Sequence, residues 1–259
     1  MSKLAMCSVT FRDKSVNEII ELARLAQLDG IEWGGDNHVP PSNLKDAEHI
    51  GELTREAGLE VVAYGSYYFA GEEMDFTEIS DTAKALGTRD IRIWAGKMDR
   101  DKEIGEIDQT DFERIVLDIK KVSEVAKEAG QIIHLEFHQW TYTDTLESAL
   151  KLLERVDCSN VFTYWQPNVH SNHRERLRQV RILNQYISNI HVFHWDEEFE
   201  RYPLSDGLVS WKEYVDLVKV KSDRYFSLEF VKDDSVEQFI EDANKLRELV
   251  RYLNLRHND

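Results

Sequence analysis

Short apolar runs and longer amphipathic segments alternate along the whole chain. The apolar runs are rich in isoleucine, valine and aromatic residues, a composition typical of buried strands. In the segment after the first run, Ile19, Leu22, Ala23 and Ala26 recur at the spacing of one helix face. The alternation predicts strands at residues 4–10, 30–33, 60–64, 90–94, 132–137, 161–165, 189–193 and 225–230.

One helix is expected after each strand. Gly58, Gly87 and Gly130 each follow such a segment, and glycine is common just beyond the last helical turn. Eight strands that alternate with eight helices predict an α/β fold, a parallel sheet closed into a single (β/α)8 TIM barrel. An open doubly wound sheet is the alternative, but no strand is followed by a glycine-rich nucleotide-binding motif. The expected helices cover residues 15–28, 43–57, 76–86, 109–129, 145–156, 174–186, 211–220 and 235–253.

The length of the chain agrees with this fold, because 259 residues suit one barrel. Only 4 prolines and no low-complexity tract interrupt it, so we expect one domain over residues 1–259. No uncharged apolar run reaches the roughly 18 residues of a membrane span, and the N-terminus lacks the apolar run of a signal peptide. Cys7 and Cys158 lie far apart, which fits a reducing compartment. We therefore expect a cytoplasmic protein with no membrane partner.

The net charge of −17 bears on the class of ligand. Nucleic-acid binding needs a basic surface against the phosphate backbone, so a strongly acidic chain makes a nucleic-acid partner unfavourable. The same charge keeps a protein soluble and helps to attract metal cations. We expect no nucleic-acid partner.

Most of the tryptophans stand where the predicted strands end. Active sites of barrels lie at the carboxyl ends of the strands, and aromatic walls with a few polar groups suit a small ligand. Apolar ring faces also suit the C–H faces of sugars, although ordinary packing at the barrel mouth is the alternative. Lys97, Arg201 or Lys232 could bind an anionic group of the ligand, although solvated surface charges are the simpler interpretation. The tryptophans at the strand ends are Trp33, Trp94, Trp140, Trp165 and Trp195.

Three polar residues interrupt the apolar strands. Glu136, Glu229 and His191 each stand within a run of isoleucine, leucine, valine or phenylalanine. A buried carboxylate must be paired, bound to a metal or protonated, because an isolated buried charge is very costly. Each residue alone is compatible with a structural salt bridge. Together at one rim of a barrel, two carboxylates and a histidine predict a divalent-metal site.

Four short motifs resemble those of the xylose-isomerase-like barrels. His134-Leu135-Glu136-Phe137-His138, followed by Thr141 to Thr145, is similar to the family's fifth-strand motif. His191-Val192-Phe193-His194 resembles its seventh-strand His-Val-Lys-Asp, and Ser227-Leu228-Glu229 its last-strand Leu-Glu. Gly207-Leu208-Val209-Ser210-Trp211 resembles the start of helix seven. The family includes sugar phosphate isomerases and epimerases, inosose and hydroxypyruvate isomerases, and the endonuclease IV group.

The resemblance implies a metal bound by Glu136, Gln166, His191 and Glu229. Gln166 stands where the family usually has aspartate, and it can supply a carbonyl oxygen but no negative charge. The usual histidine three residues later is absent, and His194 replaces the aspartate of the seventh strand. Oxygen and imidazole ligands favour Mn²⁺ or Mg²⁺, with Co²⁺ and Zn²⁺ as alternatives.

The resemblance also implies isomerisation or epimerisation of a sugar, sugar phosphate or inosose through an enediolate. Glu136 and Glu229 would exchange the proton as acid and base, and His138 or His194 would assist. The substrate would contact Trp33, Trp94, Trp140, Trp165 and Lys97. We expect a small carbohydrate substrate and a possible homo-oligomer.

Three alternatives remain. The same proton abstraction gives a dehydratase when a neighbouring hydroxyl leaves, as in the family's inosose and dehydroshikimate dehydratases. A phosphodiesterase acting on abasic DNA would need a basic groove and more metal ligands. A non-catalytic sugar-binding barrel is the third alternative, and Gln166 keeps it open.

Overall fold

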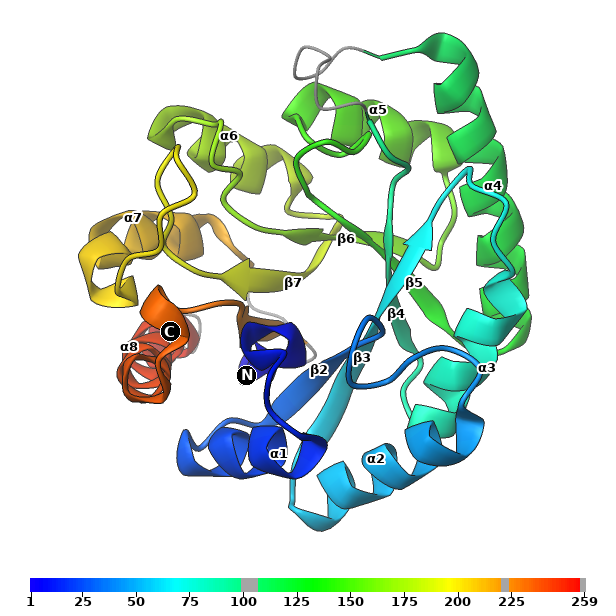
Figure 1. Cartoon of the computed structure of the whole chain (residues 1–259). Coiled ribbons are helices and arrows are strands. Elements are labelled where there is room, and N and C mark those ends of the chain that lie inside the picture. Colours follow the sequence, from blue (N-terminus) through cyan, green and yellow to red (C-terminus); the bar gives the residue numbers. More distant parts are fainter. Residues whose placement is uncertain (99–106, 220–223, 257–259) are drawn as a thin grey trace.

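Eight parallel strands form a closed barrel, in which each strand pairs with the next and β8 pairs with β1 (Figure 1). The structure is a computed structural model that describes residues 1–98, 107–219 and 224–256. The predicted TIM barrel is therefore confirmed. The strands are β1 (Lys3–Cys7), β2 (Gly30–Gly34), β3 (Glu60–Phe69), β4 (Asp90–Trp94), β5 (Ile132–Glu136), β6 (Val161–Trp165), β7 (Ile187–Val192) and β8 (Tyr225–Leu228).

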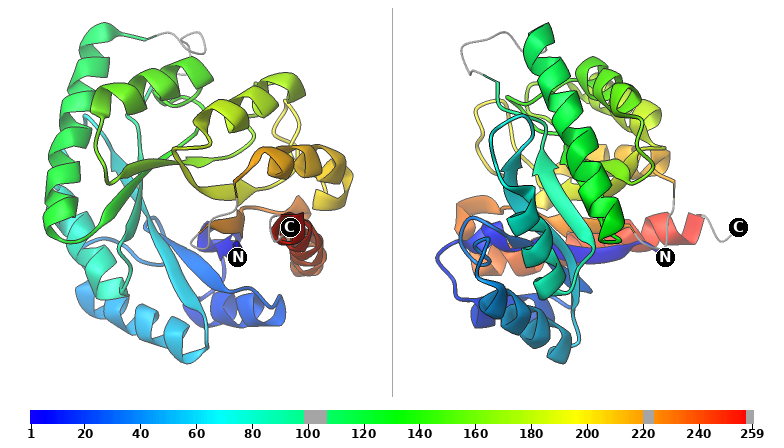
Figure 2. Two further views of the ribbon diagram at one scale, coloured as in Figure 1. Left: turned by 180° about the vertical axis from the view of Figure 1, so that it is seen from behind. Right: turned by 90° about the vertical axis from the view of Figure 1, so that its right-hand side faces the viewer.

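A ring of helices surrounds the barrel, and both views of Figure 2 show it from other sides. The two ends of the chain lie side by side, since the backbone N–H of Ser2 donates to Asn254 in the last helix at 2.9 Å. No described helix is long and apolar enough to cross a membrane. The helices are α1 (Val16–Leu25), α2 (Leu44–Glu56), α3 (Phe76–Leu86), α4 (Gln109–Glu128), α5 (Leu146–Val156), α6 (His173–Leu183), α7 (Leu204–Leu217) and α8 (Val236–Arg256).

Local sequence signals fix the helix ends. Ser15 and Glu18 form a capping box at the start of α1, and Asp108 accepts two backbone N–H groups at the start of α4. These contacts satisfy N–H groups that have no partner inside the helix. Gly87 ends α3 with a φ of 89°, a conformation that glycine adopts at little cost.

Several boundaries differ from those predicted, among them the following three. The first strand ends at Cys7, and a 3-10 turn covers Ser8–Phe11. The third strand continues to Phe69. Helix α7 begins at Leu204 rather than at residue 211, because Pro203 precedes the first turn with a φ already close to that of a helix. The predicted end of that helix at residue 220 lies outside the described residues.

Successive side chains of a strand point to opposite faces of the barrel wall. Trp33 and Trp165 are fully buried and point outward, where Trp33 Nε1 donates to Thr54 of α2 and Trp165 packs edge-on against Trp211 of α7. Their neighbours Glu32 and Gln166 consequently point into the barrel. The alternation thus divides each strand between a helix-packing face and an interior face that builds the site.

Candidate metal centre and substrate cavity

The side chains of four neighbouring strands converge at the carboxyl end of the barrel. The Nδ1 atom of His191, at the end of β7, lies 3.3 Å from Glu229 Oε2 and 3.5 Å from Glu136 Oε1. Gln166 Oε1, just after β6, lies 3.2 Å from the same nitrogen. All four residues are at most 7% exposed. The structure therefore brings the four expected metal ligands together, with oxygen atoms of the other three close to Nδ1 of His191.

The other nitrogen of His191 faces a second buried group. Glu32 of β2 lies with Oε2 3.2 Å from His191 Nε2 and with Oε1 2.9 Å from Arg92 Nε. Arg92 of β4 also donates from Nη1 to Glu136 Oε2. A continuous chain of contacts thus runs from His191 through Glu32 and Arg92 to Glu136.

Charge pairing outweighs burial at these carboxyl groups. Burial opposes ionisation of Glu136, yet the Arg92 guanidinium and His191 hold the pKa of Glu136 well below its usual range. Burial is opposed in the same way at Glu32, where His191 and Arg92 lower the pKa. At His191 burial disfavours the charged ring, but Cys7 and the surrounding carboxylates raise its pKa well above the usual value. Both carboxyl groups are therefore ionised at neutral pH.

The donor set on the Nδ1 side fits a hard divalent cation. Ligand atoms of Glu136, His191 and Glu229 all lie within 4.8 Å of one another. Carboxylate, amide and imidazole donors of this kind suit Mn²⁺ and Mg²⁺. A second group, Cys7, Glu32 and His191, meets the same distance limit on the Nε2 side. That side is a poorer site, because Arg92 already occupies one oxygen of Glu32 and burial raises the pKa of the Cys7 thiol.

A cavity of about 120 Å³ lies directly above the four converging side chains. Its walls combine aromatic and polar side chains, and Trp94 and Trp195 both contribute to it. The indole N–H groups of these two tryptophans are buried and have no hydrogen-bond partner within the described ranges. The polar side chains that line the cavity are Arg12, Tyr67, Arg92, Glu136, His138, Gln139, Gln166 and Glu229.

His138 is held in a defined orientation beside this cavity. Its ring stacks on Trp94 with centroids 4.5 Å apart, and Nδ1 lies 2.7 Å from the carbonyl oxygen of Gln139. Because a carbonyl oxygen can only accept, Nδ1 carries the proton in this contact. In the neutral ring Nε2 is then the unprotonated nitrogen, and no residue in the described part of the chain hydrogen-bonds to it.

Aromatic residues with strained backbone conformations lie near the mouth of the cavity. Trp140, Phe199 and Phe230 have φ angles of 59°, 65° and 61°, which bulky residues rarely adopt. Phe199 stacks on Trp140 with ring centroids 5.8 Å apart. Such strain is concentrated at functional sites, where packing holds it in place. At the rim, Arg12 is paired with Asp36, and Tyr67 donates to the same carboxylate.

The remaining predicted residues lie outside the cavity lining. The rings of Trp33 and Trp165 face outward and do not line the cavity, and the substrate contact expected for these two stays a prediction. Trp140 lies at the mouth, and Lys97 Nζ lies 4.0 Å from the ring centre of Phe69. His194 packs against α7, where a Cβ at Gly207 would lie 2.7 Å from its Nδ1. The catalytic role expected for His194 stays a prediction.

Sequence reasoning missed Glu32 and Arg92 as members of the site. Both stand within apolar strands, in Gly30-Ile31-Glu32-Trp33 and Asp90-Ile91-Arg92-Ile93. A charge in an apolar strand needs a partner, as at Glu136, and this signal is present at both positions. Neither belongs to one of the four motifs, so no signal beyond that argument singled them out.

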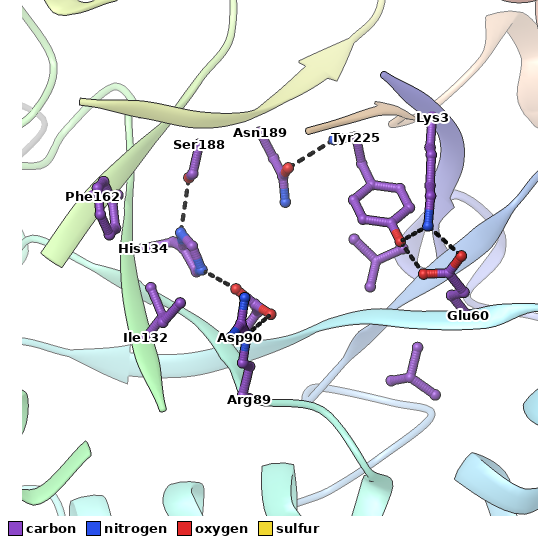
Figure 3. Close-up of a pocket in the computed structure, with 12 residues that line it drawn as sticks. Lys3, Glu60, Arg89, Asp90, Ile132, His134, Phe162, Ser188, Asn189 and Tyr225 are labelled. Atoms are coloured by element: carbon purple, nitrogen blue, oxygen red, sulfur yellow. Dashed lines mark hydrogen bonds and ion pairs between the residues drawn. The ribbon is translucent and has the colours of Figure 1, made fainter. Parts of the chain in front are cut away.

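A second cavity, of about 380 Å³, lies at the opposite end of the barrel (Figure 3). His134 lies between Ser188 and Asp90 with both contacts at 2.8 Å. Glu60 accepts hydrogen bonds from Lys3 and Tyr225 in the same view. These polar groups satisfy one another, an arrangement that closes the amino end of the barrel. Active sites of this fold lie at the carboxyl end, so the smaller cavity is the candidate site.

Comparison with known families decides the classification. Residues 20–254 match the sequence profile of the xylose isomerase-like TIM barrel family. The chain belongs to this family. The family resemblance of the sequence motifs is therefore confirmed.

Individual relatives are more distant. A 3-dehydroshikimate dehydratase of Bacillus anthracis is 24% identical over 260 residues, which cover 88% of this chain and 90% of that protein. A crystal structure of a probable 3-DHS dehydratase from the same organism has a TM-score of 0.79 at 22% identity and covers 95% of this chain and 98% of its own.

Two further solved structures share the fold at lower identity. An L-ribulose 3-epimerase has a TM-score of 0.75 at 14% identity, with 99% and 98% of the two chains covered. A xylose isomerase-like TIM barrel protein of Mycobacterium smegmatis, solved in complex with magnesium, has a TM-score of 0.71 at 13% identity, with 98% of each chain covered. Similarity at this level establishes the fold and leaves the reaction open.

Proposed function

We propose that this protein is a divalent-metal-dependent dehydratase of a small polyhydroxylated carbonyl compound of the 3-dehydroshikimate type. The observation that carries the proposal is the unequal environment of the two carboxylates. Glu136 is bound by Arg92, whereas Glu229 contacts only His191 among the ionic groups of the described chain. The named similarity to a 3-dehydroshikimate dehydratase supports the same reaction.

The unequal carboxylates argue against the symmetric acid–base pair of an epimerase. A carboxylate held by a guanidinium is a weak base, because proton uptake would break the ion pair. Glu136 therefore serves better as a permanently charged ligand than as a proton carrier. A dehydration needs one strong proton acceptor at the reacting carbon, and one such group is enough when it also returns the proton.

Four residues would hold the cation: Glu136, Gln166, His191 and Glu229. A divalent cation bound there would polarise the substrate carbonyl and stabilise the negative charge that develops when the neighbouring proton is removed. The amide oxygen of Gln166 suits such a cation as a neutral ligand. The rings of Trp94 and Trp195 line the cavity, where apolar ring faces suit the C–H groups of a polyhydroxylated substrate.

His138 is the proposed base and acid. Its Nε2 would accept the proton from the carbon next to the carbonyl, and the electron pair of that C–H bond would form the new C=C bond. The C–O bond of the neighbouring hydroxyl would break, and the leaving oxygen would take the proton back from Nε2 as water. Gln139 holds Nδ1–H throughout, and the Trp94 ring fixes the plane of the imidazole.

The isomerase or epimerase expected from the sequence is the second candidate. A specific observation favours it: Glu229 has no guanidinium partner among the described residues, so it could exchange a proton on the other side of a substrate from His138. In that case both groups would be needed, and the substrate would retain all of its hydroxyl groups.

The test is turnover of 3-dehydroshikimate with added Mn²⁺, followed by the ultraviolet absorbance of an aromatic product, alongside a panel of ketoses. We expect His138→Gln to lower kcat by about 10²–10⁴, the range typical of general acid–base residues. His49→Gln is the matched control, because His49 is exposed on α2 and does not line the cavity, and its kcat should stay near that of the wild type. Turnover of a ketose but not of 3-dehydroshikimate would favour the second candidate. Full activity of His138→Gln would contradict the proposed base.

A further inference from the structure

Glu32 occupies a position from which it can influence the site but cannot touch a substrate. It is 2% exposed and is absent from the cavity lining. Each of its two oxygens has a separate charged partner, since Oε1 accepts from Arg92 and Oε2 accepts from His191. A carboxylate can accept but not donate, so the contact at 3.2 Å requires a proton on Nε2 of His191.

We propose that Glu32 and Arg92 are positioning residues for the metal centre. This inference rests on the metal site of the proposed function. Glu32 holds one proton of His191 on Nε2, so a bound cation would take the place of the proton on Nδ1, the nitrogen that faces Glu136, Gln166 and Glu229. Histidine ligands of metals are commonly oriented by a carboxylate in this way, which also raises the basicity of the ligating nitrogen.

Arg92 links Glu32 to Glu136 and orients the second carboxylate as well. Its Nε binds Glu32 while its Nη1 binds Oε2 of Glu136, so one planar guanidinium fixes two carboxylates at once. With Oε2 engaged, the oxygen of Glu136 that faces His191 Nδ1 is Oε1. Glu136 is therefore set to ligate through a single oxygen.

The neighbouring strand leaves room for this pair. Gly65 lies in β3, between β2 and β4, and a Cβ at this position would lie 2.8 Å from Arg92 Nη2 and 2.9 Å from Glu32 Oε1. A side chain there would displace the guanidinium from the carboxylate. Gly65→Ala therefore perturbs the pair without removing any charged group.

The experiment measures Mn²⁺ binding by calorimetry in wild type, Glu32→Gln, Gly65→Ala and the control Glu60→Gln. Glu60 also accepts hydrogen bonds from two side chains, but at the amino end of the barrel. We expect Kd to rise about 10–100-fold in Glu32→Gln and Gly65→Ala, the usual effect of losing a residue that orients a ligand. Glu60→Gln should bind as the wild type does. An unchanged Kd in Glu32→Gln, or a wild type that binds no Mn²⁺, overturns the proposal.

A second measurement needs no variant. Nitrogen NMR of ¹⁵N-histidine-labelled wild type loaded with Zn²⁺ should show His191 with a proton on Nε2 and the metal on Nδ1. The reverse arrangement would overturn the role of Glu32 even if every variant failed to fold. Neither measurement involves a substrate. Tight metal binding with no turnover of 3-dehydroshikimate would refute the proposed reaction and leave the positioning role intact.

Discussion

Replacing Arg92 with methionine tests whether the buried ion pairs hold the barrel interior together. Methionine has a similar length but leaves Glu32 and Glu136 as buried carboxylates without their guanidinium partner. Removing one partner of a buried ion pair typically costs about 3–5 kcal/mol. Because one guanidinium here serves two carboxylates, we expect a loss of about 4–5 kcal/mol in the free energy of unfolding, near the top of that range.

The assay is urea unfolding in the presence of a chelator, so that no cation compensates for the lost charge. The expected effect depends on pH. In the wild type the pKa of Glu136 is lowered, so its contribution to stability is complete above the ordinary carboxyl pKa of about 4.3 and is lost as the pH falls below that value. In Arg92→Met the pKa of both carboxyl groups should rise, because burial then opposes their ionisation without the guanidinium. The penalty should therefore be greatest at neutral pH and shrink as the solution is made acidic.

Two comparisons make this prediction specific. Arg178→Met removes an exposed arginine that also contacts two glutamates, and such surface pairs contribute at most about 1 kcal/mol. The double variant Arg92→Met/Glu32→Gln leaves one uncompensated carboxylate instead of two and should recover part of the lost stability. If Arg92→Met unfolds with the same free energy as Arg178→Met at neutral pH, the reasoning about buried charge is refuted.

Two further predictions concern separate parts of the barrel. Gln166→Asp adds a negative charge beside His191 Nδ1 and should lower the Kd for Mn²⁺ by roughly tenfold, or about 1.4 kcal/mol, in a calorimetric titration; an unchanged Kd would show that Gln166 is not a ligand. Trp165→Ala removes a fully buried ring from the layer between barrel and helices and should cost about 3–5 kcal/mol in urea unfolding. The same variant should bind Mn²⁺ as the wild type does, and a large loss of affinity would contradict the outward placement of Trp165.

The fold could be predicted because hydrophobic periodicity is a local property of the chain. All eight strands follow from short apolar runs between amphipathic segments. The start of α7 could not be predicted in this way. Pro203 is a local signal that hydrophobic periodicity does not include, and the close packing of Gly207 on His194 is a contact between elements rather than part of the pattern within one.

The site could be predicted in part, for a related reason. A polar residue in an apolar strand needs a partner, and this argument found Glu136, His191 and Glu229, which the structure brings together. The placement of the tryptophans could not be predicted in this way, because proximity to a strand end does not determine which face a side chain occupies. Trp165 and Gln166 are neighbours in sequence, yet one packs against α7 and the other lies beside His191.

The charges around His191 explain how a glutamine can replace an acidic ligand. Among the described residues that contact His191 or Arg92 in this cluster, three carboxylates face one guanidinium, which leaves two negative charges when His191 is neutral. One divalent cation balances them without any charge at Gln166. In the metal-free protein the surrounding carboxylates instead raise the pKa of His191, so a proton on Nδ1 competes with the cation for the same lone pair. Gln166 can thus contribute a neutral oxygen, while Glu136 and Glu229 supply the charge that a divalent cation requires.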